Sequence, residues 1–413
     1  MGTPEAQRAV EAVVRNSYGR LVSFLAARSR DVAGAEDALG EAFRAALETW
    51  PERGVPDNPD GWLFTAARRH LLDGARRAAV RADAASPLRL LADELAEVTA
   101  ATEIPDDRLR LLFVCAHPAI GADVHTPLML QTVLGLDAAR IASAFCVAPA
   151  TMGQRLARAK AKIRLAGIPF TVPETRELPA RLDAVLQAIY AAYGAGWDDV
   201  AGADPRRRGL AEEAIWLARL VVRLLPDEPE ARGLLALMLH CEARRAARRG
   251  PDGEYVPLSE QDIALWSSSL INEAELALSA AATQNTPGRF QLEAAIQSVH
   301  AHRAVTGRTD WEAIALLYEG LVGDTPTLGA LVGRAAALGN ARGATAGLAA
   351  LEAIAPAAVA AYQPYWAVRA HLLAEAGHAD AAGEAYARAG GLSEVPEVRA
   401  FLLSRRTARR TSS

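Results

Sequence analysis

The strongest constraint on the fold is the nearly unbroken helical character of the chain. Across the 413 residues, apolar positions recur every three or four residues, and alanine, leucine, arginine and glutamate dominate. No segment sustains the apolar–polar alternation of a strand. At ~100–200 residues per domain, the length allows two to four domains. We therefore predict an all-α protein made of several helical blocks.

Composition narrows the class of protein further. Hydrophobic residues make up 51% of the chain, which excludes a wholly disordered protein. Cys115, Cys146 and Cys241 are too few and too scattered for a disulfide framework or a four-ligand zinc site. The first residues are polar and charged, and no run of ~18 apolar residues predicts a membrane span. We expect a reduced, cytoplasmic protein without a membrane partner.

Proline- and glycine-rich stretches divide the chain into blocks. The first block, residues 1–82, holds three expected helices, over 6–28, 32–50 and 59–81. Asp31 and Asn58 stand before the second and third helices, where a short polar side chain can cap the free backbone amides. Pro51 is expected to end the second helix. The acidic, turn-rich residues 83–104 are expected to form a linker.

The second block, residues 105–170, has the pattern of a helix-turn-helix. Its expected helices cover residues 107–115, 122–134, 137–145 and 149–165. Only Cys146-Val147-Ala148 separates the last two, and the final helix is basic, which is typical of this DNA-binding motif. The side chains expected to pack the two helices together are Leu136, Ile141, Phe145, Met152 and Leu156.

The third block, residues 171–413, is an alanine-rich helical array with an internal repeat. A shift of 35 residues aligns four pairs of positions: Ala335 with Ala370, Leu338 with Leu373, Ala346 with Ala381, and Leu351 with Tyr386. This alternation of small and large residues is typical of a tetratricopeptide repeat, whose period is ~34 residues. We therefore predict a tetratricopeptide-like array of helical pairs.

Charge is concentrated in two basic islands on a chain whose net charge is only −4. Residues 61–81 contain five arginines and one aspartate, and residues 138–165 contain six arginines or lysines and no acid. Two separate islands predict two localised contacts with a polyanion.

The second island coincides with the helix-turn-helix. Its last helix is expected to turn six side chains outward: Thr151, Gln154, Arg155, Arg158, Lys160 and Lys162. Glutamine and arginine suit base edges in the major groove, and the later cations suit phosphates. The alternative interpretation is a solvated amphipathic helix with no ligand.

The first island combines aromatic and cationic side chains on one helix: Trp62, Phe64, Arg68, Arg69, Arg76 and Arg77. Aromatic rings stack on unpaired bases while arginines follow the backbone of a single strand. The alternative is core packing with a charged outer face, since Trp62 and Leu63 also match core spacing.

Residues that could carry catalysis or hold a metal are sparse. Cys115 and His117 are two neighbours without further ligands, and His300 and His302 lack partners in the sequence. No phosphate-binding glycine loop, nucleophile motif or zinc-binding motif occurs. We predict no catalytic residues, no metal, no cofactor and no enzymatic activity.

The order of these parts resembles a known family. The runs AEDALGEAF (35–43) and GWLFTAARRHLLDGARR (61–77) resemble region 2 of sigma-70-family initiation factors of the extracytoplasmic-function type, and residues 136–164 resemble region 4. The runs VPDNPDGWL (55–63), FVCAHPAI (113–120) and residues 150–173 are similar to the subgroup with a C-terminal tetratricopeptide-like extension. The resemblance implies region 2 over 1–82, region 4 over 105–170 and the extension over 171–413.

The resemblance also implies roles for particular residues. Asp37 and Glu41 would dock on the clamp helices of core RNA polymerase. The helix after Asn58 would capture the melted −10 strand of promoter DNA, and the helix-turn-helix would bind the −35 duplex. Three positions depart from the family pattern, namely Gly40, Gly153 and the run Gly194-Ala195-Gly196-Trp197.

These observations predict a sigma factor that directs RNA polymerase to promoters. The extension would regulate or support that activity, through an intramolecular contact with the sigma domains. Two alternatives stay open. One is a helix-turn-helix regulator with a repeat domain that never joins polymerase, and the other is a helical-repeat scaffold whose DNA module is inactive.

Overall fold

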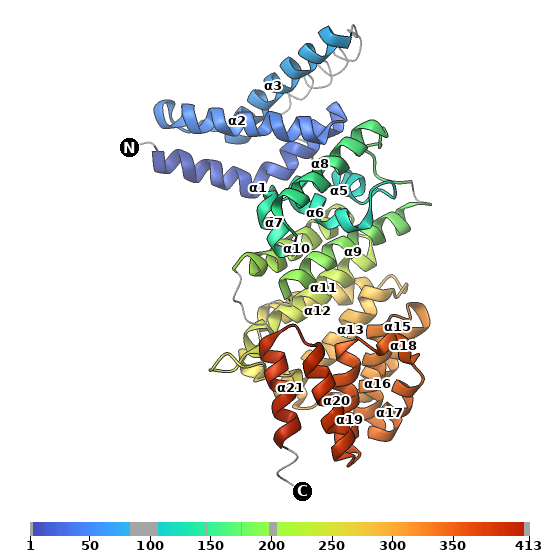
Figure 1. Ribbon diagram of the computed structural model, residues 1–413. Helices are drawn as coiled ribbons and strands as arrows, with labels where there is room; N and C mark the ends of the chain where they lie inside the picture. The colour runs from blue at the N-terminus through green and yellow to red at the C-terminus, as the bar shows by residue number, and fades with distance from the viewer. Residues whose placement is uncertain (1–2, 83–105, 146, 175, 198–204, 409–413) are drawn as a thin grey trace. The chain divides into compact units, whose positions relative to one another are not determined.

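The computed structural model describes residues 3–82, 106–145, 147–174, 176–197 and 205–408 (Figure 1). Within these ranges the regular elements are helices, apart from one isolated antiparallel bridge between Arg249 and Tyr255. The predicted all-α class is therefore confirmed. The chain divides into two compact units, residues 1–196 and residues 197–413, here called unit 1 and unit 2. The predicted linker, 83–104, lies outside the described residues.

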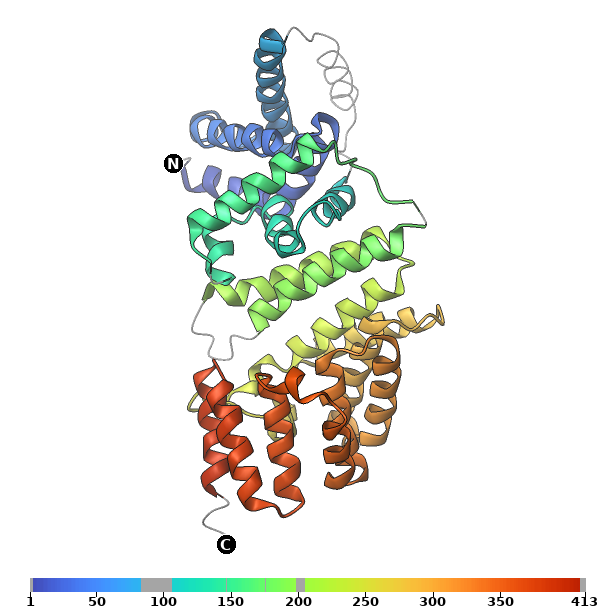
Figure 2. The same ribbon diagram turned by 45° about the vertical axis from the view of Figure 1, so that its right-hand side comes forward.

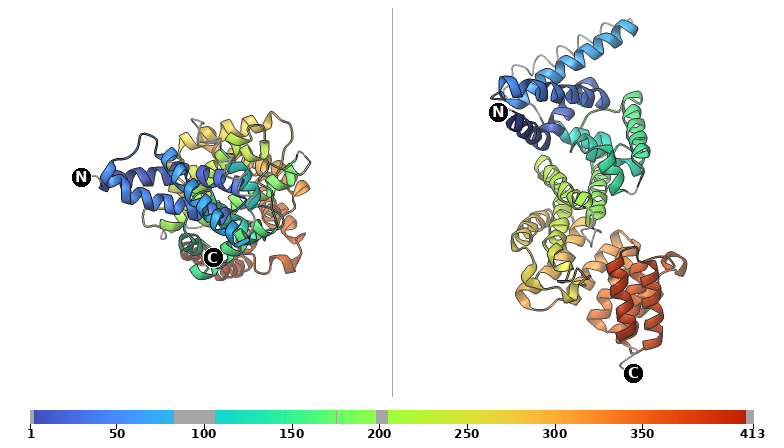
Figure 3. Two further views of the ribbon diagram at one scale, coloured as in Figure 1. Left: turned by 90° about the horizontal axis from the view of Figure 1, so that it is seen from above. Right: turned by 60° about the vertical axis from the view of Figure 1, so that its left-hand side comes forward.

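Unit 1 begins with a bundle of three helices. These are α1 (Thr3–Ser29), α2 (Val32–Arg53) and α3 (Pro59–Ala82). Helices α1 and α2 pack side by side, and α3 contacts both before it extends away from the pair (Figure 3). Large side chains that are almost fully buried form the core of this bundle: Leu21, Phe24, Leu25, Leu39, Trp50 and Leu63.

The capping residues act as predicted, whereas the proline does not. The Asp31 carboxylate accepts a hydrogen bond from the Gly34 amide at 3.2 Å, and the Asn58 side-chain oxygen Oδ1 accepts one from the Gly61 amide at 2.9 Å. Pro51 lies inside α2, so the prediction that it ends the helix is wrong. A proline removes only one helical amide, and α2 continues to Arg53 and ends before Gly54, where the backbone turns to a φ of 83°.

The second block of unit 1 contains four shorter helices. They are α5 (Arg108–Cys115), α6 (Ala122–Thr132), α7 (Ala138–Ala144) and α8 (Pro149–Leu165). Helices α7 and α8 pack against each other as a helix-turn-helix would. Four of the five side chains predicted at their interface are buried, namely Leu136, Ile141, Met152 and Leu156, while Phe145 is half-buried.

Unit 1 also includes helix α9 (Leu178–Trp197). The Thr126 hydroxyl on α6 donates to the Ala188 carbonyl at 2.9 Å, and the Arg181 guanidinium donates to the Phe113 carbonyl of α5 at 2.6 Å. The boundary predicted at residue 170 therefore falls inside a compact unit, because α9 is hydrogen-bonded to the helices that precede it.

Helix α1 approaches the end of α6 so closely that a larger residue at the contact should lower the stability of the fold. A Cβ atom added at Gly19 would overlap the Val133 carbonyl oxygen, whereas one added at Gly40 would meet nothing within 4 Å. We expect Gly19→Ala to lower the free energy of unfolding by about 1–3 kcal/mol, because the backbone must shift. Gly40→Ala, at an exposed helical position, should raise it by up to about 1 kcal/mol. Urea unfolding measures both, and equal effects would contradict the close approach.

Unit 2 starts with helices joined by longer connections. They are α10 (Pro205–Leu224), α11 (Pro229–Ala243), α12 (Ser268–Ala282), α13 (Arg289–Ala301), α14 (Arg303–Thr306) and α15 (Trp311–Asp324), with short 3-10 turns η1 (Arg245–Arg248), η2 (Leu258–Glu260) and η3 (Ile263–Leu265). Helix α11 packs on both α12 and α13, and its nearly unbroken buried run from Gly233 to His240 makes it the central helix of this part.

Two helical pairs complete unit 2, followed by a last helix (Figures 1 and 2). The pairs are α16 (Leu328–Arg342) with α17 (Ala344–Glu352), and α19 (Gln363–Glu375) with α20 (Ala379–Leu392); α18 (Pro356–Val359) and α21 (Pro396–Ala408) are the remaining helices. The two pairs start at residues 328 and 344 and again at 363 and 379, an offset of 35 in each case. This offset equals the shift that aligned the sequence.

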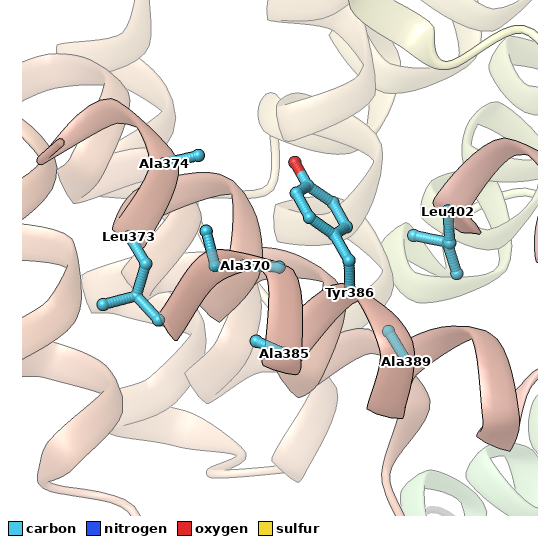
Figure 4. Close-up of a cluster of buried hydrophobic side chains, with 8 residues drawn as sticks. Ala370, Leu373, Ala374, Ala385, Tyr386, Ala389 and Leu402 are labelled. Carbon is cyan, nitrogen blue, oxygen red and sulfur yellow. The ribbon is translucent and has the colours of Figure 1, made fainter. Parts of the chain in front are cut away.

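Small residues let the paired helices approach each other. A Cβ atom added at Gly347 on α17 would stand 2.8 Å from the Ala335 carbonyl oxygen on α16. In the second pair, Ala370, Ala385 and Ala389 belong to one buried cluster with Tyr386, to which α21 contributes Leu402 (Figure 4). Small residues at the crossing and one large residue in the groove give the packing that the sequence predicted.

Candidate nucleic-acid interface

Helix α8 has one buried face and one exposed cationic face. Met152, Leu156, Ala159 and Ile163 form the buried face. The exposed face follows the same helical spacing and consists of Thr151, Arg155, Arg158 and Lys162, here called the α8 stripe. Gln154 is also exposed beside it. Five of the six side chains predicted on this helix are therefore available to a ligand.

The start of α8 is suited to a phosphate. Pro149 occupies the first turn, and no side chain caps the free backbone amides there. Arg155 forms an ion pair with Asp123 at 3.7 Å, and both side chains are largely exposed. Such a surface pair is worth roughly 0–1 kcal/mol, so a phosphate can replace the carboxylate at little cost.

Lys160 departs from the sequence prediction. Its ammonium group donates to the Glu36 carboxylate on α2 at 2.6 Å and to the Gln131 side-chain oxygen at 2.9 Å. The Lys160 side chain is only 13% exposed, because position 160 lies beside the buried face of α8 and not on the α8 stripe. Lys160 is therefore an internal contact in this structure and not an outward cation.

Helix α3 divides its predicted residues between the core and the surface. Phe64 is 3% exposed and packs edge-on against Phe24, with ring centroids 5.4 Å apart, so it departs from the predicted role of a base-stacking residue. It shares the buried spacing of Leu63 and Ala67. Trp62 is half-buried against Trp50, at 5.5 Å between centroids.

The arginines of α3 follow Trp62 along the helix. Arg69 is exposed and Arg68 is half-buried. Arg76 and Arg77 belong to the described helix, but their side chains lie outside the description. The surface that α3 offers for a single strand therefore consists, where it is described, of the partly exposed Trp62 and the two arginines that come after it.

Asp60 holds the start of α3, a role that no local pattern predicts. Its carboxylate accepts hydrogen bonds from the Ser17 hydroxyl and the Arg20 guanidinium, both at 2.7 Å. Both partners lie on α1, 43 and 40 residues away, so no local pattern connects them. This contact holds the first turn of α3, with Trp62, against α1.

The outer face of α2 presents carboxylates. Asp37 and Glu41 are exposed on adjacent turns, as predicted. Glu41 forms an ion pair with Arg44, and this hydrogen bond lowers the pKa of the Glu41 carboxyl group, which keeps it ionised. Gly40 lies between them and leaves the surface open, because nothing stands within 4 Å of its missing Cβ atom. This face can accept cationic partners.

Cys115, His117 and His300 take part in local packing or hydrogen bonds. Cys115 is fully buried next to the Thr132 hydroxyl at 3.3 Å, and burial raises the pKa of its thiol to about 12. The ring of His117 accepts a hydrogen bond from the Ala119 amide. His300 packs edge-on against Trp311, and burial lowers its pKa to about 4, while His302 is exposed.

Within the residues that the structure covers, no three histidine, cysteine, aspartate or glutamate side chains are grouped so that they could hold a metal ion. No helix in the same residues has the length and hydropathy of a membrane-spanning segment.

Comparison with known proteins assigns part of the chain to described families. The family described as Sigma-70 region 2 matches residues 13–81, and a family of unknown function (DUF6596) matches residues 181–282. An uncharacterized protein of Rhizobium meliloti (strain 1021) is 38% identical over 374 residues, which cover 89% of this chain and 88% of that protein. No solved structure matches the chain.

Proposed function

We propose that this chain, which belongs to the sigma-70 family, directs core RNA polymerase to a set of promoters. It has region 2 at its N-terminus and a DUF6596 domain after it. One observation carries the proposal. Unit 1 contains both the residues that match Sigma-70 region 2 and the exposed cationic α8 stripe. A factor that opens promoters needs both a polymerase-binding helix and contacts to DNA.

In this proposal, α8 binds duplex DNA and α3 binds the melted strand. The α8 stripe binds the −35 duplex, with Gln154 and Arg155 at base edges and the later cations on phosphates. Trp62, Arg68 and Arg69, together with Arg76 and Arg77, hold the −10 strand after melting. Unstacking a base costs a few kcal/mol, and contacts made only to the open strand offset that cost. Asp37 and Glu41 bind polymerase.

We also propose a sigma-factor type, a cellular compartment and a role for unit 2. The factor is of the extracytoplasmic-function type, acts in the cytoplasm and has no enzymatic activity of its own. Unit 2 is a tetratricopeptide-like extension that regulates or supports initiation, by contact with the sigma domains. The 35-residue offset between its two helical pairs supports this assignment.

Transcription in vitro tests the central proposal. Purified core polymerase and the full chain would be incubated with genomic DNA, and the start sites would be mapped. We expect start sites that require the chain and share an upstream element. Transcription unchanged by the chain, combined with salt-dependent duplex binding, would favour the regulator that never joins polymerase. No duplex binding at all would favour the inactive scaffold.

Shortening the chain tests the role of unit 2. Because α9 is hydrogen-bonded to α5 and α6, the cut belongs after Trp197 and not at residue 170. We expect the chain 1–197 to keep its helical circular-dichroism signal and its start sites, but to initiate at a level that differs several-fold from that of the full chain. The same level in both chains would end the proposed role of unit 2.

A further inference from the structure

The two DNA-binding blocks of unit 1 share a packed interface. Helix α1 meets α5, and α2 meets α8 (Figure 2). Arg28 of α1 donates to Asp107 at the start of α5 at 2.8 Å, and the Asp107 side chain is only 7% exposed. Together with the close approach of Gly19 to Val133, this contact shows that region 2 and the helix-turn-helix block pack as one body in the free chain.

The centre of the contact between α2 and α8 is an ion pair shielded from water. The Lys160 ammonium and the Glu36 carboxylate lie 2.6 Å apart, and their side chains are 13% and 12% exposed. Burial raises the pKa of the Glu36 carboxyl group, and the charge of Lys160 opposes that rise. Breaking such a pair leaves one buried charge without its partner, which is costly. Arg164 adds a more exposed ion pair to Asp31 at 3.3 Å.

This arrangement brings acids next to the helix that would bind the duplex. Asp31 and Glu36 hold the side of α8 that carries Lys160 and Arg164. Lys160 and Arg164 are already paired with these carboxylates, so DNA phosphates that approach this side of α8 would have to displace them. Asp37, the neighbour of Glu36, is exposed on the face of α2 proposed for polymerase. One helix thus carries both the contact to α8 and the proposed polymerase surface.

We propose that Lys160 is a positioning residue that latches α8 onto α2 through Glu36, and that this latch limits duplex binding by the free chain. The inference rests on the proposed function, since it takes α8 to be the duplex-binding helix. It assigns opposite roles to the two lysines of the chain. Lys162 on the α8 stripe adds to duplex affinity, whereas Lys160 lowers it by holding the closed form.

A zero-length cross-linker tests the latch without DNA. Carbodiimide activates a carboxyl group, and an amine that lies against it then displaces the activating group to form an amide bond, with loss of the urea. We expect mass spectrometry of the full chain to find a Glu36–Lys160 amide. Lys162 is the internal control, because it has no carboxylate partner among the described residues. Absence of the Glu36–Lys160 product would overturn the closed contact.

Duplex affinity tests the consequence. The probe is a mixed-sequence duplex long enough to span one helix-turn-helix site, titrated by fluorescence anisotropy. We expect Lys160→Met and Glu36→Gln each to bind about fivefold tighter or more, the lower end of typical coupling between sites. Lys162→Met should bind about eightfold weaker at ~0.1 M salt, from the release of roughly one counterion. The double variant Glu36→Gln/Lys160→Met leaves no buried charge and guards against misfolding, which circular dichroism checks.

The outcomes separate the latch from the proposed function. Weaker binding by both Lys160→Met and Lys162→Met would mean that Lys160 is an ordinary phosphate contact, and would overturn the latch. If the cross-link forms but no variant binds the duplex, the proposed function fails and the effect of the latch on DNA fails with it. The closed contact between α2 and α8 would then stand alone as an established feature.

Discussion

Core RNA polymerase is expected to fail to co-purify with a chain in which Asp37 and Glu41 are both changed to lysine. The two exposed carboxylates on α2 would become ammonium groups, and opposed like charges at an interface cost several kcal/mol. A loss of about 3 kcal/mol lowers affinity by roughly a hundredfold or more. Pull-down and fluorescence titration with purified core polymerase would measure the loss.

The control is Glu11→Lys, which changes one exposed acid on α1 to lysine and so makes half the charge change of the double variant. Its affinity for polymerase should stay close to that of the unchanged chain, and circular dichroism should show all three proteins folded. If the double variant keeps full affinity, α2 is not the polymerase-binding helix. If Glu11→Lys loses as much, the effect comes from net charge and not from the outer face of α2.

A chain with Arg158→Ala and Lys162→Ala is expected to bind duplex DNA roughly sixtyfold more weakly at ~0.1 M salt, because each phosphate contact releases ~0.9 counterion. The slope of log affinity against log salt should become less steep by about 1.8. Both residues are exposed on the α8 stripe, so the fold should not change. Fluorescence anisotropy across a salt series measures affinity and slope together.

Removal of two exposed arginines from unit 2, Arg223→Ala with Arg308→Ala, is the control for net charge. This variant should keep the salt slope of the unchanged chain. A slope that falls equally in both variants would show that duplex binding has no defined surface. A slope that falls in neither would show that the α8 stripe is a solvated helix face, the alternative interpretation of its sequence.

Local signals in the sequence predicted the local structure well. Asp31 and Asn58 cap their helices because one short side chain next to a helix start suffices for this contact. The spacing of Met152 and Leu156 identified the buried face of α8 for the same reason. The offset of 35 residues in unit 2 follows from repetition within the chain itself.

Contacts between distant segments could not be predicted in this way. Lys160 and Glu36 are 124 residues apart, and no pattern in the sequence around either residue predicts their contact. The sequence around Lys160 predicts only an exposed cation on a basic helix. Phe64 shows the same limit on a smaller scale, since an aromatic ring beside arginines suits both stacking on bases and a core. The contact with Phe24, which lies far away in the sequence, shows that the Phe64 ring belongs to the core.

The hydrogen bonds of α9 have a mechanical consequence. A helix is stiff along its axis, and this one is anchored near its start by Arg181 and near its middle by Ala188, while its far end leads through the backbone into unit 2. A force on the end of α9 would therefore act on α5 and α6, to which α9 is hydrogen-bonded. Within unit 1, α9 is thus a stiff strut whose displacement would also move α5 and α6.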